Sequence, residues 1–173
     1  HPSYVTSLLT AICETTGSRV DAPATALANL MRSGERLFSS CRQQFEIRLH
    51  RARGYGALKA ILSVLAEEEP LTLTQIATRI QRTAGSTKDY LSWLEDVDLI
   101  SVQRKRYSFL DPLLRLWVKL HCQAVPPSEK RLTNEVKNYT LSRLPNVAES
   151  VDAHQSETQE KKSAQTLAMI EID

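Results

Sequence analysis

The chain has 173 residues, of which 42% are hydrophobic and 24% charged, and its formal net charge is +2. This composition supports a folded core and excludes a wholly disordered chain. The net charge is too small to indicate a nucleic-acid partner, so the local distribution of charge has to decide. Because no run of 18 apolar residues occurs, we predict no membrane partner. Three widely spaced cysteines without a CxxC pair favour a reducing cytoplasm, which is the predicted location.

The N-terminal third of the chain predicts helices. Apolar residues recur at helical spacing in the opening segment HPSYVTSLLTAI. We expect a first helix over 3–16, a second that begins after Asp21, and a third over 35–52, together forming a helical subdomain over 1–53. The chain opens inside the first helix without an initiator Met, so we expect it to be the C-terminal part of a larger protein.

Residues 54–122 predict a winged helix-turn-helix. A buried apolar stripe over 58–65 indicates the first helix, and Thr74 is the expected N-cap of a short second helix. Ala84 and Gly85 are expected to form the turn. Ser86 is then the expected N-cap of the third helix. Two short helices joined by a tight turn are the elements of a helix-turn-helix.

A short β-hairpin is predicted directly after this motif. Apolar and polar residues alternate over 99–103 and over 106–110, and Arg104 and Lys105 lie between the two runs. The predicted fold class is therefore mainly α, with a helical subdomain followed by a winged helix-turn-helix that carries a small β-hairpin.

The segment DPLLRLWVKL predicts a further helix. Asp111 is its expected N-cap, and Pro112 suits its first position. Arg115 lies one turn after Asp111, at a spacing that allows the two side chains to pair. Trp117 is expected to pack against the winged-helix core rather than stack on a base.

Two segments follow this helix. Residues 123–148 are predicted to hold a C-terminal helix that Ser128 caps and that ends near Leu144. Residues 149–173 are polar, lack periodicity and have a net charge of −4. They predict an acidic, flexible tail.

The charge pattern leaves two classes of partner open. The segment 86–98 has a net charge of −3, which is unfavourable opposite the phosphates of double-stranded DNA. The tip of the wing is positive. The candidate DNA contacts are Ser86, Thr87, Lys88, Arg104, Lys105 and Arg106. A protein or intramolecular partner is the alternative, and a solvated turn would also explain the basic tip.

Sequence motifs for catalysis do not occur in the chain. It contains no P-loop, nucleophile-elbow or HExxH motif, and its His and Cys residues lack the spacing of zinc ligands. We therefore predict no catalytic residue, no metal site and no cofactor in this sequence.

Several short elements carry a resemblance to a known family. The chain opens HPSY, the third helix of the predicted winged helix contains Tyr90-Leu91-x-x-Leu94, and YSF and DPLLRLW follow. Over residues 1–122 this order resembles the C-terminal half of prokaryotic P-loop ATPases of the AAA/STAND type, the archaeal-ATPase-like group. It is similar, more distantly, to the lid and winged-helix regions of the origin-recognition initiators of archaea.

The resemblance implies a role in nucleotide-dependent coupling. In that family an upstream domain with Walker A and Walker B motifs binds ATP and Mg, and this sequence lacks both motifs. The family's lid begins with a Gly-x-Pro or His-Pro element near the nucleotide, so the resemblance makes His1 and Pro2 nucleotide-proximal candidates. The acidic third helix departs from many relatives, which puts sequence-specific DNA reading in doubt.

Three functions are consistent with these observations. The first is the lid and winged-helix output module of an AAA/STAND-type ATPase, which couples nucleotide state to a partner surface and contacts the missing nucleotide-binding domain. The second is a DNA-binding module that contacts phosphates through its basic wing. The third is a non-catalytic protein-interaction adaptor that uses the apolar face of 113–120 or the tail.

Overall fold

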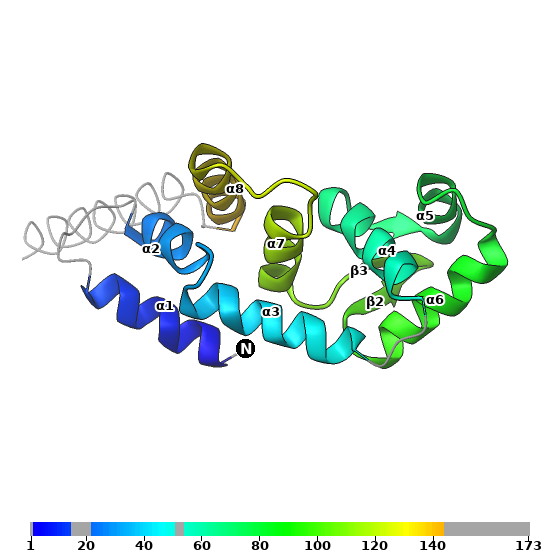
Figure 1. Ribbon diagram of the computed structural model, residues 1–173, viewed down its shortest axis with the longest axis horizontal. Helices are drawn as coiled ribbons and strands as arrows, with labels where there is room; N and C mark the ends of the chain where they lie inside the picture. Colours follow the sequence, from blue (N-terminus) through cyan, green and yellow to red (C-terminus); the bar gives the residue numbers. More distant parts are fainter. Residues whose placement is uncertain (1, 15–21, 51–53, 144–173) are drawn as a thin grey trace, which may run out of the picture. The chain divides into compact units, whose positions relative to one another are not determined.

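The structure is a computed structural model that describes residues 2–14, 22–50 and 54–143. Within these residues it contains eight helices and one three-stranded antiparallel sheet that includes a β-hairpin (Figure 1). The described residues up to Tyr139 belong to one compact unit. The predicted fold class, mainly α with a small hairpin, is confirmed. The predicted tail over 149–173 lies outside the described residues.

Three N-terminal helices precede the sheet: α1 (Pro2–Glu14), α2 (Ala22–Leu30) and α3 (Arg36–Leu49). Each packs against the other two and buries apolar side chains. Tyr4 and Phe45 are among the buried residues. The expected cap Asp21 lies outside the described residues.

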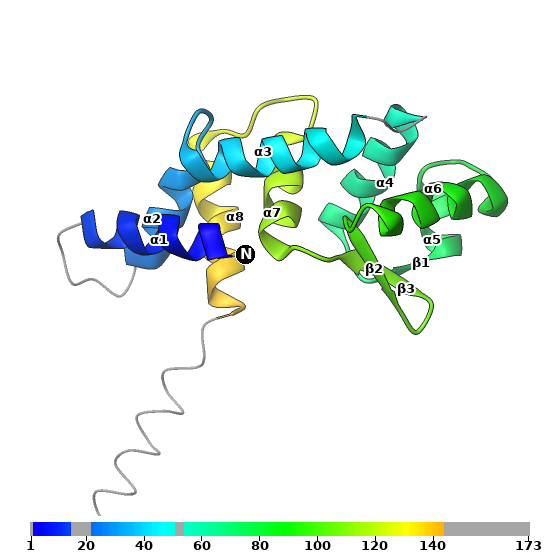
Figure 2. The ribbon, with the colours of Figure 1, turned by 90° about the horizontal axis from the view of Figure 1, so that it is seen from below.

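The next elements follow the order of a winged helix: α4 (Tyr55–Glu67), β1 (Leu71–Thr72), α5 (Leu73–Arg79), α6 (Ala84–Asp96), β2 (Ile100–Gln103) and β3 (Arg106–Phe109). The sheet has the order β1-β3-β2, with both pairs antiparallel. Strand β1 was not expected from the sequence as a partner of the hairpin. Figure 2 shows the hairpin of β2 and β3 projecting away from α6. This hairpin is the wing.

Both short helices of the motif begin earlier than predicted. Thr72, not Thr74, is the N-cap of α5, and its side chain forms a capping box with Gln75. Thr83, not Ser86, is the N-cap of α6. Ala84 and Gly85 are therefore the first residues of α6, and the turn lies before them. The shift matters because it moves every candidate contact residue on α6 further from the helix end.

Two helices follow the wing: α7 (Pro112–His121) and α8 (Glu129–Leu141). The Asp111 carboxylate accepts hydrogen bonds from two backbone N–H groups of α7, which confirms it as the N-cap. Ser128 accepts one from Arg131, which confirms the cap of α8. Among the described residues, no helix is long and apolar enough to cross a membrane.

Helix α7 joins the N-terminal helices to the winged helix, because it packs against both α3 and α4. Trp117 on α7 is buried, as predicted, and its ring contacts two phenylalanines of α3 as well as His121 of its own helix. Its ring centroid lies 5.3 Å from that of Phe45 and 5.9 Å from that of Phe38. Trp117 therefore holds two segments of the chain together. Its burial excludes base stacking.

Candidate functional site

The outward face of the helix-turn-helix is set by which side of α6 is buried. Helix α6 packs against α4, α5 and β2. Its inward residues are Leu91, Leu94 and, unexpectedly for a polar residue, Thr87. Lys88 and Ser92 lie on the exposed side. This face, together with the wing, is the surface that a partner of a helix-turn-helix would contact.

Two of the candidate DNA contacts on α6 are engaged within the protein. Thr87 is fully buried, and its hydroxyl donates to the Thr83 carbonyl at 2.8 Å. The prediction that Thr87 contacts DNA is therefore wrong, because a buried side chain cannot reach DNA. Ser86 is half-buried, and its hydroxyl lies 3.0 Å from the Thr83 hydroxyl and 3.2 Å from the Thr83 carbonyl oxygen.

Lys88 is the exposed cation that α6 itself contributes. The same helix exposes Asp89, Glu95 and Asp96, so its exposed charges sum to −2. Each of these carboxylates would be repelled by a DNA phosphate in the same groove. The exposed side of α6 is therefore poorly suited to enter a DNA groove.

The tip of the wing is a two-residue turn formed by Arg104 and Lys105. Strands β2 and β3 flank this turn, and Gln103 at the end of β2 pairs with Arg106 at the start of β3. Arg104 has φ 50° and Lys105 has φ 64°, as a type I′ turn requires. Both side chains are exposed. The two candidate contacts are thus brought together at the end of the hairpin.

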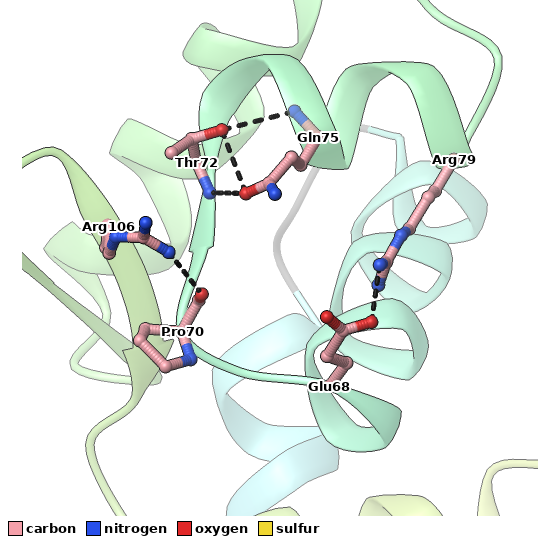
Figure 3. A network of polar contacts seen from close by, with 6 residues as sticks. All are labelled: Glu68, Pro70, Thr72, Gln75, Arg79 and Arg106. Atoms are coloured by element: carbon pink, nitrogen blue, oxygen red, sulfur yellow. Dashed lines mark hydrogen bonds and ion pairs between the residues drawn. The ribbon is translucent and has the colours of Figure 1, made fainter.

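Arg106, the third candidate on the wing, supports the sheet. It faces Thr72 across the β1–β3 ladder. Its guanidinium donates to the Pro70 carbonyl oxygen at 3.3 Å, which links β3 to the segment before β1 (Figure 3). In the same view, Thr72 and Gln75 form the capping box, and Arg79 pairs with Glu68. The Arg106 contacts hold the turn end of β3 against β1 and the segment before it.

Glu69 fixes the other end of β3. Its Oε2 accepts a hydrogen bond from the Phe109 N–H at 2.7 Å, and its Oε1 lies 3.3 Å from Nε of Arg115. Arg115 therefore pairs with Glu69 and not, as predicted, with Asp111. Sequence spacing suggested the local pair, whereas the observed pair joins residues that are distant in the sequence.

Tyr90 marks a contact that sequence reasoning missed. The Arg82 guanidinium lies over the Tyr90 ring, 5.7 Å from its centroid. On the N-terminal side of α4, Gly54 has φ 84°, and a Cβ there would lie 2.7 Å from a ring carbon of Tyr90. Gly54 is thus required both by its conformation and by this close approach. No pattern in the sequence indicates the contact.

A groove of about 310 Å³ is lined by residues of α3, α4, α7 and the segments next to them. Its lining combines aromatic rings with three charged side chains, Arg42, Glu46 and Lys59. His121 is part of this lining, and its Nε2 lies 3.0 Å from the Met31 carbonyl oxygen. Burial lowers the pKa of His121 below its usual value, which favours the neutral imidazole.

Burial disfavours ionisation of the cysteine thiols in this region. Burial raises the pKa of the Cys122 thiol to about 11 and that of the Cys41 thiol to about 12. A thiol acts as a nucleophile or metal ligand only as the thiolate, so neither is activated. Among the residues that the structure describes, no three His, Cys, Asp or Glu side chains gather where they could hold a metal ion.

The nucleotide-proximal candidates are at the start of the chain. His1 lies outside the described residues. Pro2 is the first residue of α1, and its side chain is also outside the description. Neither a family model nor a curated protein matches the chain.

Proposed function

We propose that this chain is a non-catalytic output module, in which the N-terminal helices and the winged helix move as one body, and that it belongs to an AAA/STAND-type ATPase. The observation that supports the proposal best is the packing of Trp117 on α7 against Phe38 and Phe45 on α3. Close-packed interiors transmit displacement because they deform little. A movement of α3 would therefore be passed through α7 to the winged helix.

A second contact strengthens the same coupling. Nη1 of Arg48 on α3 donates to the Asp98 carbonyl oxygen at 3.0 Å, in the turn between α6 and β2. Asp98 has φ 56°, so this turn adopts a conformation that the helix cannot continue. Helix α3 thus contacts the winged helix through α7 and through the end of α6.

The two sides of the winged helix then have different roles. One side, at Asp98 and Trp117, contacts the N-terminal helices. Figure 2 shows the wing turn on the side away from α3. An arrangement of this kind suits a module that receives a displacement on one side and presents a surface on the other. The resemblance to the ATPase family supplies the source of the displacement, namely ATP binding and hydrolysis in an upstream domain.

Hydrogen exchange on the intact gene product, with and without ATP, tests the proposal. We expect ATP to change the exchange of the wing, residues 100–109, in the wild type. Phe45→Ala should abolish that change, because it removes the ring that contacts Trp117. Ile47→Ala on the same helix is the matched control, since Ile47 is 65% exposed.

Two results would overturn the proposal. One is an intact product without Walker motifs or ATP hydrolysis, which would remove the ATPase. The other is an undiminished ATP effect on the wing in folded Phe45→Ala protein, which would remove the coupling path through α3 and α7.

A further inference from the structure

We infer that the wing turn is a strained cationic tip that binds the phosphate backbone of double-stranded DNA without reading its base sequence. The inference rests on the proposed function in one respect, because it names the partner of the surface that the module presents. The residues that carry it are Arg104 and Lys105.

The backbone of the turn is the first observation. Arg104 and Lys105 are consecutive residues with positive φ, 50° and 64°. A residue with a Cβ is disfavoured in this left-handed region, and two-residue hairpin turns of this type prefer Asn-Gly. The turn therefore holds local strain that an Asn-Gly turn would lack. Strain of this kind points to a function for the side chains that cause it.

The freedom of the two side chains is the second observation. Both are exposed, and neither is paired with or hydrogen-bonded to a residue in the described part of the chain. Arg106 differs, because it donates to the Pro70 carbonyl and lies opposite Thr72 in the ladder. Two adjacent, unpaired cations at the end of a projecting hairpin suit a ligand with closely spaced negative charges. The backbone of duplex DNA has one charge per about 1.7 Å of helix axis.

The outward face of α6 explains why the binding is independent of sequence. Base reading by a recognition helix needs polar side chains that reach base edges. Thr87 is buried, and the Ser86 hydroxyl is bonded within the protein. This leaves Lys88 and Ser92 as the exposed polar side chains that could face bases, on a helix that also exposes the carboxylates of Asp89, Glu95 and Asp96. The wing therefore supplies phosphate contacts, and α6 adds little discrimination between bases.

The test compares two double variants in fluorescence anisotropy with two duplexes of unrelated sequence. Arg104→Asn with Lys105→Gly removes both charges and installs the residues that the turn prefers. Arg36→Gln with Lys130→Gln removes the same charge from exposed positions on α3 and α8 and serves as the control. Circular dichroism melting establishes that each variant is folded.

We expect the wing variant to bind on the order of 100-fold more weakly than wild type at about 50 mM salt, and the slope of log K against log salt to fall by about two. Its melting temperature should rise by about 3 °C, because the strain of the turn is relieved. The control should keep its melting temperature and lose less than about tenfold in affinity. Wild type should bind both duplexes equally within about threefold.

Three results would each overturn the inference: no binding of either duplex by wild type, equal losses in the wing variant and the control, or a preference above about tenfold for one duplex. Binding of an acidic protein surface in place of DNA would appear as the first of these. A lower melting temperature of the wing variant would remove the argument from strain. None of these results bears on the ATP-dependent exchange of the wing, so the proposed function would fail or stand separately.

Discussion

Replacing Phe45 by Ala should weaken the whole folded unit, because its ring lies in the contact between α3 and α7. Phe45 is 1% exposed, and its centroid is 5.3 Å from that of Trp117. Burying a phenyl ring removes about 150–200 Å² from water, which at about 25 cal/mol per Å² corresponds to about 4–5 kcal/mol. Because Ala keeps one methyl group while the substitution leaves a cavity, we expect a loss of about 3–5 kcal/mol.

Urea denaturation followed by far-UV circular dichroism measures this loss. With a denaturant slope of about 2 kcal/mol per M, the midpoint should fall by roughly 2 M. Ile47→Ala should change the free energy of unfolding by less than about 0.5 kcal/mol, because Ile47 is exposed. If both variants lost the same stability, or if Phe45→Ala lost less than about 1 kcal/mol, the packing of α3 on α7 would not hold the unit together. Hydrogen exchange that increased in α1–α3 alone would also refute the reasoning.

Three further predictions concern single side chains. Thr72→Ala should lower the free energy of unfolding by about 1 kcal/mol, whereas Thr74→Ala should change it by less than about 0.5 kcal/mol; equal effects in urea melts would contradict the observed cap. Glu69→Ala should cost about 2 kcal/mol, because it leaves the Phe109 N–H and the half-buried Arg115 guanidinium without their partner; a loss below about 0.5 kcal/mol would show that the ion pair is solvated. Burial lowers the pKa of His121 in the folded state, so the unfolded chain binds more protons as the pH falls. The stabilising contribution of His121 is therefore complete above the unfolded pKa near 6.5 and decreases as the pH falls toward the lower folded pKa. In urea melts from about pH 7.5 to pH 5, His121→Phe should remove this part of the pH dependence. If the free energy of unfolding of the variant depended on pH as that of wild type does, the prediction would be refuted.

Local patterns predicted the elements of the fold well. Apolar periodicity located all three N-terminal helices, and alternation located β2 and β3. Asp111 and Ser128 were identified as caps because each directly precedes an apolar helical repeat. These features depend on residues within one or two turns of each other, so a sequence displays them directly.

Errors of two and three residues arose where two possible N-caps competed. Thr72 and Thr74 both precede the apolar residues of α5, and the deciding signal was the Thr-x-x-Gln spacing that ends at Gln75. Thr83 and Ser86 competed in the same way before α6. The error had a functional consequence, because it placed Thr87 on the outward face when its side chain is buried.

Long-range contacts were beyond local patterns. The Trp117 ring packs against phenylalanine rings that are more than 70 positions away in the sequence, and Arg115 on α7 pairs with Glu69 in the segment before β1. Which rings meet depends on how α3 crosses α7, and a helical repeat does not contain that information. The different roles of the three basic residues of the wing were also beyond local patterns. Arg106 supports the sheet because it lies opposite β1, and the sequence did not predict that pairing.

The separation of charge within the winged helix favours contact through the wing over insertion of α6. The acidic end of α6 lies beside the turn at Asp98, which α3 covers through Arg48. A duplex that approached along the whole length of α6 would therefore meet Glu95 and Asp96 close to the N-terminal helices. A duplex that approached the wing would meet Arg104 and Lys105 in its turn. Figure 2 shows the hairpin of β2 and β3 extending away from α3. Attraction at the wing turn and repulsion at the acidic end of α6, both effective within about one Debye length of the surface, would orient a duplex toward the wing.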